Sequence, residues 1–224
     1  MFWSALGDLM PLAFAALISP MPIVAAIALL LGPKGRGNAV AFALAYLIGT
    51  FGVTLAFSFG SSGATSSGTD AERIFHIVLG FALAALFLYL AWRAFQHRPR
   101  KGVPTPTPKW LAAVDSFGLL GSAGLGLLLG VVNAKNLPIM IAAGASIGTA
   151  QLTWPLVLVA AAIFAVLGGL GVLVPVLIGS SGSKRVHVFL DATKSALIDH
   201  NSVIMIVLFL ILAAVQLGKA FSAI

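Results

Sequence analysis

Lys135 places a positive charge inside a long apolar stretch of the sequence. Asparagines flank it in the segment Asn133-Ala134-Lys135-Asn136. A lysine at the centre of a membrane helix costs about 3 kcal/mol or more, so it needs a partner, water or a functional reason. The ammonium group and the two side-chain amides could bind an anionic or polar headgroup. Lysine can instead snorkel toward an interface or pair with an aspartate, and the sequence leaves this alternative open.

Proline interrupts the apolar sequence at two places, one in each half of the chain. Pro138 follows the lysine segment, and the cluster Ser19-Pro20-Met21-Pro22 lies in the first half. Proline removes a backbone donor and clashes with the preceding turn, so each cluster predicts a broken helix or, alternatively, a simple kink. Broken apolar segments at corresponding positions indicate a transporter-like site near the bilayer midplane. We expect this site to have two walls, formed by Lys135, Asn133, Asn136 and Pro138 on one side and by Ser19, Pro20 and Pro22 on the other.

Two carboxylates, Asp8 and Asp115, precede the two breaks in corresponding segments. Either could carry a proton or pair with Lys135, although a hydrated carboxylate at a segment end is the commoner case. The four histidines are scattered, cysteine is absent, and the sequence contains no metal-binding, nucleophile or phosphate-binding motif. We therefore expect neither enzymatic activity nor a cofactor or metal.

The composition is that of a membrane protein. Hydrophobic residues form 60% of the chain and charged residues only 8%, and the mean hydropathy is +1.08. Soluble domains carry about 25% charged residues, so the sequence predicts an all-α integral membrane protein whose partners are membrane lipids. The net charge of +7 comes from basic residues grouped in a few loops, which sets membrane orientation and does not indicate nucleic acid.

The length accommodates six transmembrane segments of about 20 residues each. They are expected as two inverted three-helix repeats, with segments one and four broken, because an odd number of spans inverts the second repeat. The first repeat covers residues 1–97, a basic proline-rich cytoplasmic linker covers 98–112, and the second repeat covers 113–224. Within the second repeat, apolar residues at helical spacing predict an amphipathic interfacial helix over 184–198, followed by a separate span from about 203 to 221. Asp199, His200 and Asn201 are expected at the start of that span, with a helix-capping role for Asp199 or Asn201.

Lysine and arginine set the expected orientation. Most of them fall in the loop after the first segment, in the central linker and in the loop before the last span. With six spans these three regions share one side, which the positive-inside rule makes cytoplasmic. Both termini are then expected outside the cytoplasm.

Several short motifs carry a family resemblance. They are Ser19-Pro20-Met21-Pro22-Ile23, the turn Gly32-Pro33-Lys34-Gly35-Arg36-Gly37-Asn38-Ala39, the segment Asn133-Ala134-Lys135-Asn136-Leu137, and the stretch from Leu190 to Lys219. Together they resemble the sulfolipid-addressing and glycopeptidolipid-addressing (Sap/GAP) proteins of the lysine-exporter (LysE) superfamily. The family's second motif usually reads Asn-Pro-Lys-Asn-Leu, and Ala134 stands here at the position of its proline.

The resemblance implies a multi-pass protein of the bacterial inner membrane that helps move cell-envelope glycolipids toward the surface. It implies a transporter or a transport accessory that works beside a larger lipid exporter, and a homo-oligomer is a further possibility. The wider superfamily implies a different activity, proton-coupled export of amino acids or other small solutes. A non-transporting scaffold of a lipid-export complex is the alternative from another functional class.

Overall fold

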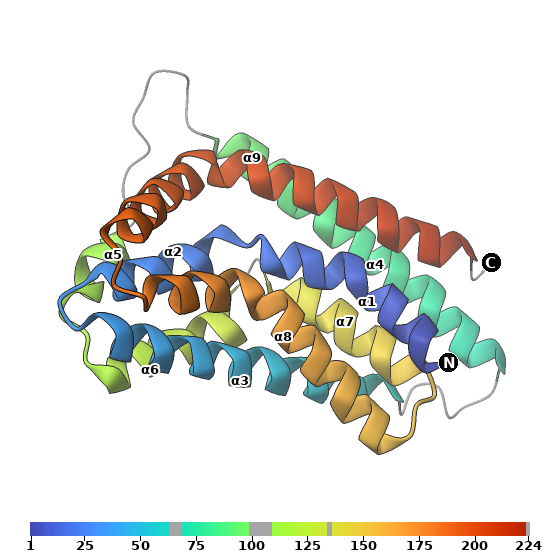
Figure 1. Ribbon diagram of the computed structural model, residues 1–224. Coiled ribbons are helices and arrows are strands. Elements are labelled where there is room, and N and C mark those ends of the chain that lie inside the picture. Colours follow the sequence, from blue (N-terminus) through green and yellow to red (C-terminus); the bar gives the residue numbers. More distant parts are fainter. Residues whose placement is uncertain (63–68, 99–108, 134–135, 223–224) are drawn as a thin grey trace.

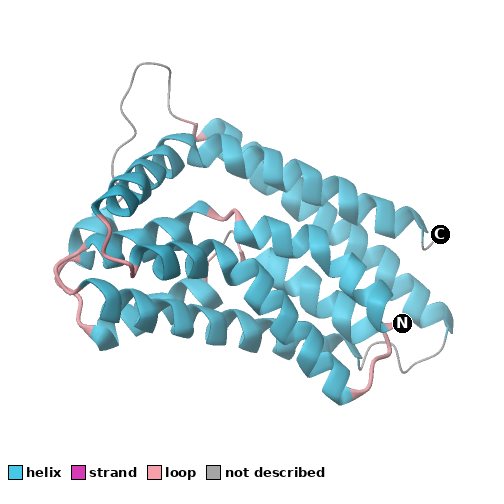
Figure 2. Cartoon of the chain, in the orientation of Figure 1, coloured by secondary structure: helices cyan, strands magenta, loops and turns pink. Residues whose placement is uncertain are grey.

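The computed structural model describes residues 1–62, 69–98, 109–133 and 136–222. These ranges contain helices and connecting loops but no strand (Figure 2). The helices are α1 (Phe2–Leu17), α2 (Pro20–Leu31), α3 (Gly35–Ser62), α4 (Thr69–Gln96), α5 (Lys109–Val114), α6 (Leu119–Val131), α7 (Leu137–Thr149), α8 (Trp154–Gly179) and α9 (Lys184–Ser222). The predicted all-helical class is confirmed.

Four helices of the described chain are long and apolar enough to cross a membrane. They are α3, the part of α4 from residue 77 to 96, α8 and α9. Helices α1 and α2 meet the same criterion together, with a bend of 51° between them, so the described chain has four or five candidate spans. Helices α6 and α7 have 13 residues each, which gives about 20 Å per helix against a hydrocarbon core of about 30 Å.

Helices α6 and α7 follow α3 in the same direction along most of its length (Figure 1). Successive glycines meet successive turns of α3: Gly126 meets Phe42, Gly130 meets Tyr46, Gly144 meets Thr54 and Gly148 meets Ser58. A Cβ atom at Gly130 would lie only 2.6 Å from the carbonyl oxygen of Tyr46. Small residues permit such close approach of membrane helices, so this glycine series fixes α6 and α7 against α3.

The remaining long helices pack in two further pairs. Helix α8 runs in the direction of α1 and α2, since Gly168 meets Ala16 and Gly179 meets Leu30. Helix α4 runs antiparallel to α9: Gly80 meets Ala220 near one end, and the rings of Phe87 and Phe209 stack at 6.1 Å further along. Both chain termini consequently lie at one end of the bundle (Figure 1).

The outer surface of the bundle carries many large apolar side chains. Ile48 on α3 is 65% exposed and Leu177 on α8 is 70% exposed. Water would oppose such exposure, whereas lipid tails solvate it at no cost. This surface supports insertion in a membrane.

Helix α9 corrects the prediction for residues 184–221. The structure has one continuous helix from Lys184 to Ser222, with a bend in its first part, instead of a separate helix over 184–198 and a span beginning at 203 (Figure 1). The polar residues Asp199, His200 and Asn201 lie inside this helix, so the predicted capping role is wrong. Residues 184–217 contain no proline or glycine that would end the helix. His200 Nδ1 lies 2.9 Å from the carbonyl oxygen of Ala196, one turn earlier.

The predicted linker over 98–112 also overlaps a helix. Helix α5 begins at Lys109, and the linker residues 99–108 lie outside the described residues. The side-chain amide of Asn38 on α3 donates a hydrogen bond of 2.8 Å to the carbonyl oxygen of Phe117. This bond fixes the turn after α5 against the beginning of α3.

Candidate functional site

The first predicted break is present between α1 and α2. Helix α1 ends at Leu17, and Pro20 begins α2 at a position where its missing N–H is no loss. Ser19 precedes α2 and is only 1% exposed. Its Oγ has no hydrogen-bond partner among the described residues. The break therefore holds a buried hydroxyl group beside the N-terminus of α2, which no side chain of the described residues caps.

The second predicted break is present between α6 and α7. Helix α6 ends at Val131 and α7 begins at Leu137, one residue before Pro138. The backbone N–H of Asn136 donates to the carbonyl oxygen of Asn133 over 2.9 Å, and both asparagines are buried. Lys135 and Ala134, which the sequence places between them, lie outside the described residues.

Tyr46 on α3 anchors this second break. The side-chain amide of Asn136 donates a hydrogen bond of 3.1 Å to the Tyr46 hydroxyl, and both groups are buried. The Oδ1 atom of the same amide has no partner within the described chain. An unpaired buried acceptor costs about 1–3 kcal/mol. A ligand that donates a hydrogen bond to this oxygen would remove that cost. Sequence reasoning missed Tyr46, although a tyrosine in the middle of an apolar helix is a recognisable signal.

The two breaks lie at the same level of the bundle. On α8, Gly171 packs against the backbone of Leu17, just before the first break. Two residues earlier on α8, Gly169 packs against Leu47, the neighbour of Tyr46. The predicted wall residues Ser19, Pro20, Pro22, Asn133, Asn136 and Pro138 are all buried near this level.

The two predicted carboxylates lie at opposite ends of the bundle, away from the breaks. Asp115 is exposed in the turn after α5, and its Oδ1 would lie 3.3 Å from a Cβ atom at Gly32. Asp8 lies at the end that holds both termini, where its Oδ1 is 3.7 Å from Lys219 Nζ. Asp8 therefore has a basic partner on α9, and the pairing with Lys135 stays a prediction because that lysine is outside the described residues.

A cavity of about 760 Å³ surrounds the Asp8–Lys219 pair. Helices α1, α4, α7 and α9 line it, and Lys219 Nζ donates a hydrogen bond of 3.2 Å to Ser146 Oγ on α7. Gln216 lines the same cavity and is 4% exposed. Sequence reasoning missed this polar group, although an amide and an ammonium three residues apart share one face of an apolar helix.

Basic side chains gather at the opposite end of the bundle. Lys34 and Arg36 are exposed at the beginning of α3, and Lys184 and Arg185 are exposed at the beginning of α9. Leu30 lies near the end of α2, just before α3, and Gly179 ends α8, just before α9. The contact between these two residues places the beginnings of α3 and α9 next to each other. The predicted concentration of positive charge on one side agrees with this placement.

The helical architecture, the apolar exterior and the four or five candidate spans define a multi-pass membrane protein. Residues 9–222 match the family model described as Sap, sulfolipid-1-addressing protein. The chain therefore belongs to the Sap, sulfolipid-1-addressing protein family, as its motifs predicted. No curated protein and no solved structure matches the chain.

Proposed function

We propose that this protein transports, or assists the transport of, cell-envelope glycolipids out of the bacterial inner membrane, without enzymatic activity. The observation that carries the proposal is the family match over residues 9–222, because the family description concerns the addressing of a sulfolipid. The apolar exterior supports a role within the bilayer. In the accessory form of the proposal, the partner is a larger lipid exporter.

Six crossings in two inverted repeats are the architecture that we propose for this function. In this arrangement α6 and α7 form one broken crossing, as α1 and α2 do. The packing supports the pairing, because α1–α2 runs along α8 in one direction and α6–α7 runs along α3 in the same manner. Exchange of the two repeats replaces α1–α2 by α6–α7, α3 by α8, and α4 by α9. It therefore converts the contact of α1–α2 with α8 into the contact of α6–α7 with α3, and it leaves the α4–α9 pair unchanged. Such exchange symmetry is typical of secondary transporters with inverted repeats.

Single-cysteine labelling tests the crossing by α6–α7. Ser116 lies before α6, Thr153 lies before α8 and Ser181 follows α8; all three are exposed. We expect cysteines at 116 and 181 to react from the cytoplasmic side and a cysteine at 153 from the opposite side. The chain has no cysteine of its own, so the parent protein is an unlabelled control. Reaction of positions 116 and 153 from the same side would contradict the six-crossing arrangement.

The headgroup site that we propose lies between the two breaks. Lys135 would supply positive charge, and the amides of Asn133 and Asn136 would supply hydrogen bonds. Ser19 would contact the headgroup from the opposite wall, whose backbone geometry Pro20 and Pro22 set. The Oγ of Ser19 and the Oδ1 of Asn136, which have no hydrogen-bond partner within the described ranges, support this assignment, since buried polar atoms usually have partners.

Ligand-dependent thermal unfolding tests the substrate class. A ligand that binds only the native state stabilises it by about 2.7 kcal/mol at a concentration one hundred times its Kd. We expect saturable stabilisation by a dialkyl glycolipid and none by the matching dialkylglycerol, which lacks the headgroup. Saturable stabilisation by a basic amino acid alone would favour the small-solute exporter. An unchanged unfolding temperature with all three ligands would favour the scaffold.

A further inference from the structure

Helices α1 and α9 form a seam whose two parts differ in chemistry. At the end with the termini, the seam opens into the polar cavity with Asp8, Gln216 and Lys219. Toward the middle of the bundle it continues as an apolar groove of about 400 Å³, lined by α1 residues from Pro11 to Ile18 and by α9 residues from Val203 to Leu212. On α1, Asp8 and Pro11 are three residues apart, so about one helical turn joins the polar part to the apolar part.

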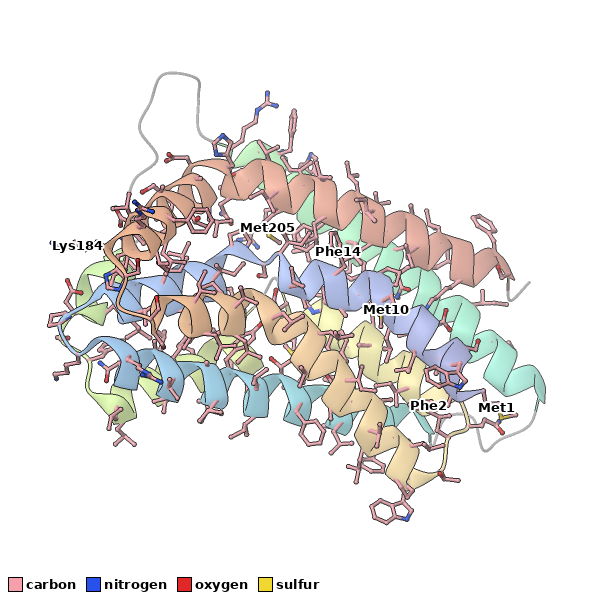
Figure 3. All side chains as sticks on the ribbon, in the orientation of Figure 1. Met1, Phe2, Met10, Phe14, Lys184 and Met205 are labelled. Atoms are coloured by element: carbon pink, nitrogen blue, oxygen red, sulfur yellow. The ribbon has the colours of Figure 1, made fainter. Side chains whose placement is uncertain are left out.

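The groove opens toward the outer surface of the protein. Phe14 on α1 is 64% exposed, and Val207 on α9 is 51% exposed. In Figure 3, Phe14 lies on the side of α1 that faces α9. An apolar chain can therefore enter this groove sideways from the bilayer.

The polar part of the seam contains an incomplete set of hydrogen bonds. The Oε1 atom of Gln216 has no partner within the described chain, and the residue is 4% exposed. The Asp8 carboxylate is an acceptor, and its distance of 3.7 Å from Lys219 Nζ is longer than a charge-assisted hydrogen bond of about 2.8 Å. A matching ligand must donate to Gln216 and Asp8 and must accept from Lys219. Hydroxyl groups do both, whereas a phosphodiester only accepts.

We propose that the α1–α9 seam binds one membrane glycolipid, with its hydroxylated sugar headgroup at Gln216, Asp8 and Lys219 and one alkyl chain along Phe14 and Val207. This site lies at the end of the bundle that holds the termini, apart from the headgroup site between the two breaks. Its polar residues come from α1 and α9, which belong to different repeats of the proposed architecture. The seam would thus hold a glycolipid at the side of the protein.

Photo-crosslinking from position 14 tests the seam. Phe14 is replaced by p-benzoylphenylalanine, which keeps an aromatic ring, and the protein is placed in phosphatidylcholine vesicles that contain a minor fraction of dialkyl glucolipid. The same replacement at Ile48, which is 65% exposed on α3, reports ordinary lipid contact. We expect the ratio of glucolipid to phosphatidylcholine adducts to be about fivefold higher at position 14, the factor that one net hydrogen bond gives.

Substitution of Gln216 tests the headgroup contact. Gln216→Leu is expected to remove the enrichment at position 14, and Gln96→Leu, at an exposed glutamine of α4, is expected to preserve it. Lys219→Met provides a second variant if the leucine protein does not fold. Equal adduct ratios at positions 14 and 48, enrichment of phosphatidylcholine, or enrichment that survives both seam substitutions would overturn the proposal. Lys135→Ala leaves the seam intact, so enrichment at position 14 should persist in that variant whether or not the site between the breaks is correct.

Discussion

Gly126→Ala is expected to lower the unfolding temperature of the protein in detergent. A Cβ atom at this position would meet the carbonyl oxygen of Phe42 and would lie 3.0 Å from the Cβ of Ala45. Neither is the flexible end of a long side chain, so α6 and α3 would have to separate. Overpacking of this kind costs about 1–3 kcal/mol, which corresponds to about 2–12 °C for a chain of this size.

Gly124→Ala is the matched control on the same helix. A Cβ atom at Gly124 would have no atom of another described helix within 4 Å. Alanine is more stable than glycine in a helix by about 0.5–1 kcal/mol, so this variant should unfold at the same temperature or slightly higher. Equal unfolding temperatures for the alanine variants at 124 and 126 would show that the close packing of α6 on α3 does not hold the bundle together.

The breaks of this fold were predictable because proline acts locally. A helix that continued from α1 would need backbone N–H groups at positions 20 and 22, which Pro20 and Pro22 lack, and the structure ends α1 at Leu17 and begins α2 at Pro20. The course of α9 was less predictable. Asp199 and Asn201 favour a helix cap by residue type, but Asp199 is exposed and Asn201 is partly exposed on α9, and neither interrupts the helix. Polar type alone does not end a helix whose backbone can continue.

The residues of the candidate site were likewise predictable only in part. Asn136 was predictable from its place beside a break, whereas its hydrogen bond to Tyr46 joins residues 90 positions apart. The Asp8–Lys219 pair likewise depends on the docking of α9 against α1. The sequence places these two residues at opposite ends of the chain and contains no periodicity that links them. Contacts of this type follow from tertiary packing, which local residue patterns do not encode.

Lys135→Ala is expected to reduce glycolipid transport by about ten- to one-hundredfold, because a hydrogen bond to a charged group contributes about 1.5–3 kcal/mol. The substitution removes a charge whose place in an apolar stretch is costly unless it has a function. The hydrogen bond between Asn136 and Tyr46 does not involve the lysine side chain, so we expect the variant to fold. The rate of appearance of a fluorescent glycolipid in the outer leaflet of reconstituted vesicles measures the effect.

Lys184→Ala and Lys135→Arg are the controls for this experiment. Lys184 is exposed at the beginning of α9, and loss of a solvated charge there should change transport by less than about twofold. Arginine at 135 keeps the positive charge and the hydrogen-bond donors, so it should restore much of the activity. A well-folded Lys135→Ala protein that transports at the parent rate would exclude Lys135 from the headgroup site. Equal loss in the alanine and arginine variants would indicate that the shape of the side chain matters there and that the positive charge alone is not sufficient.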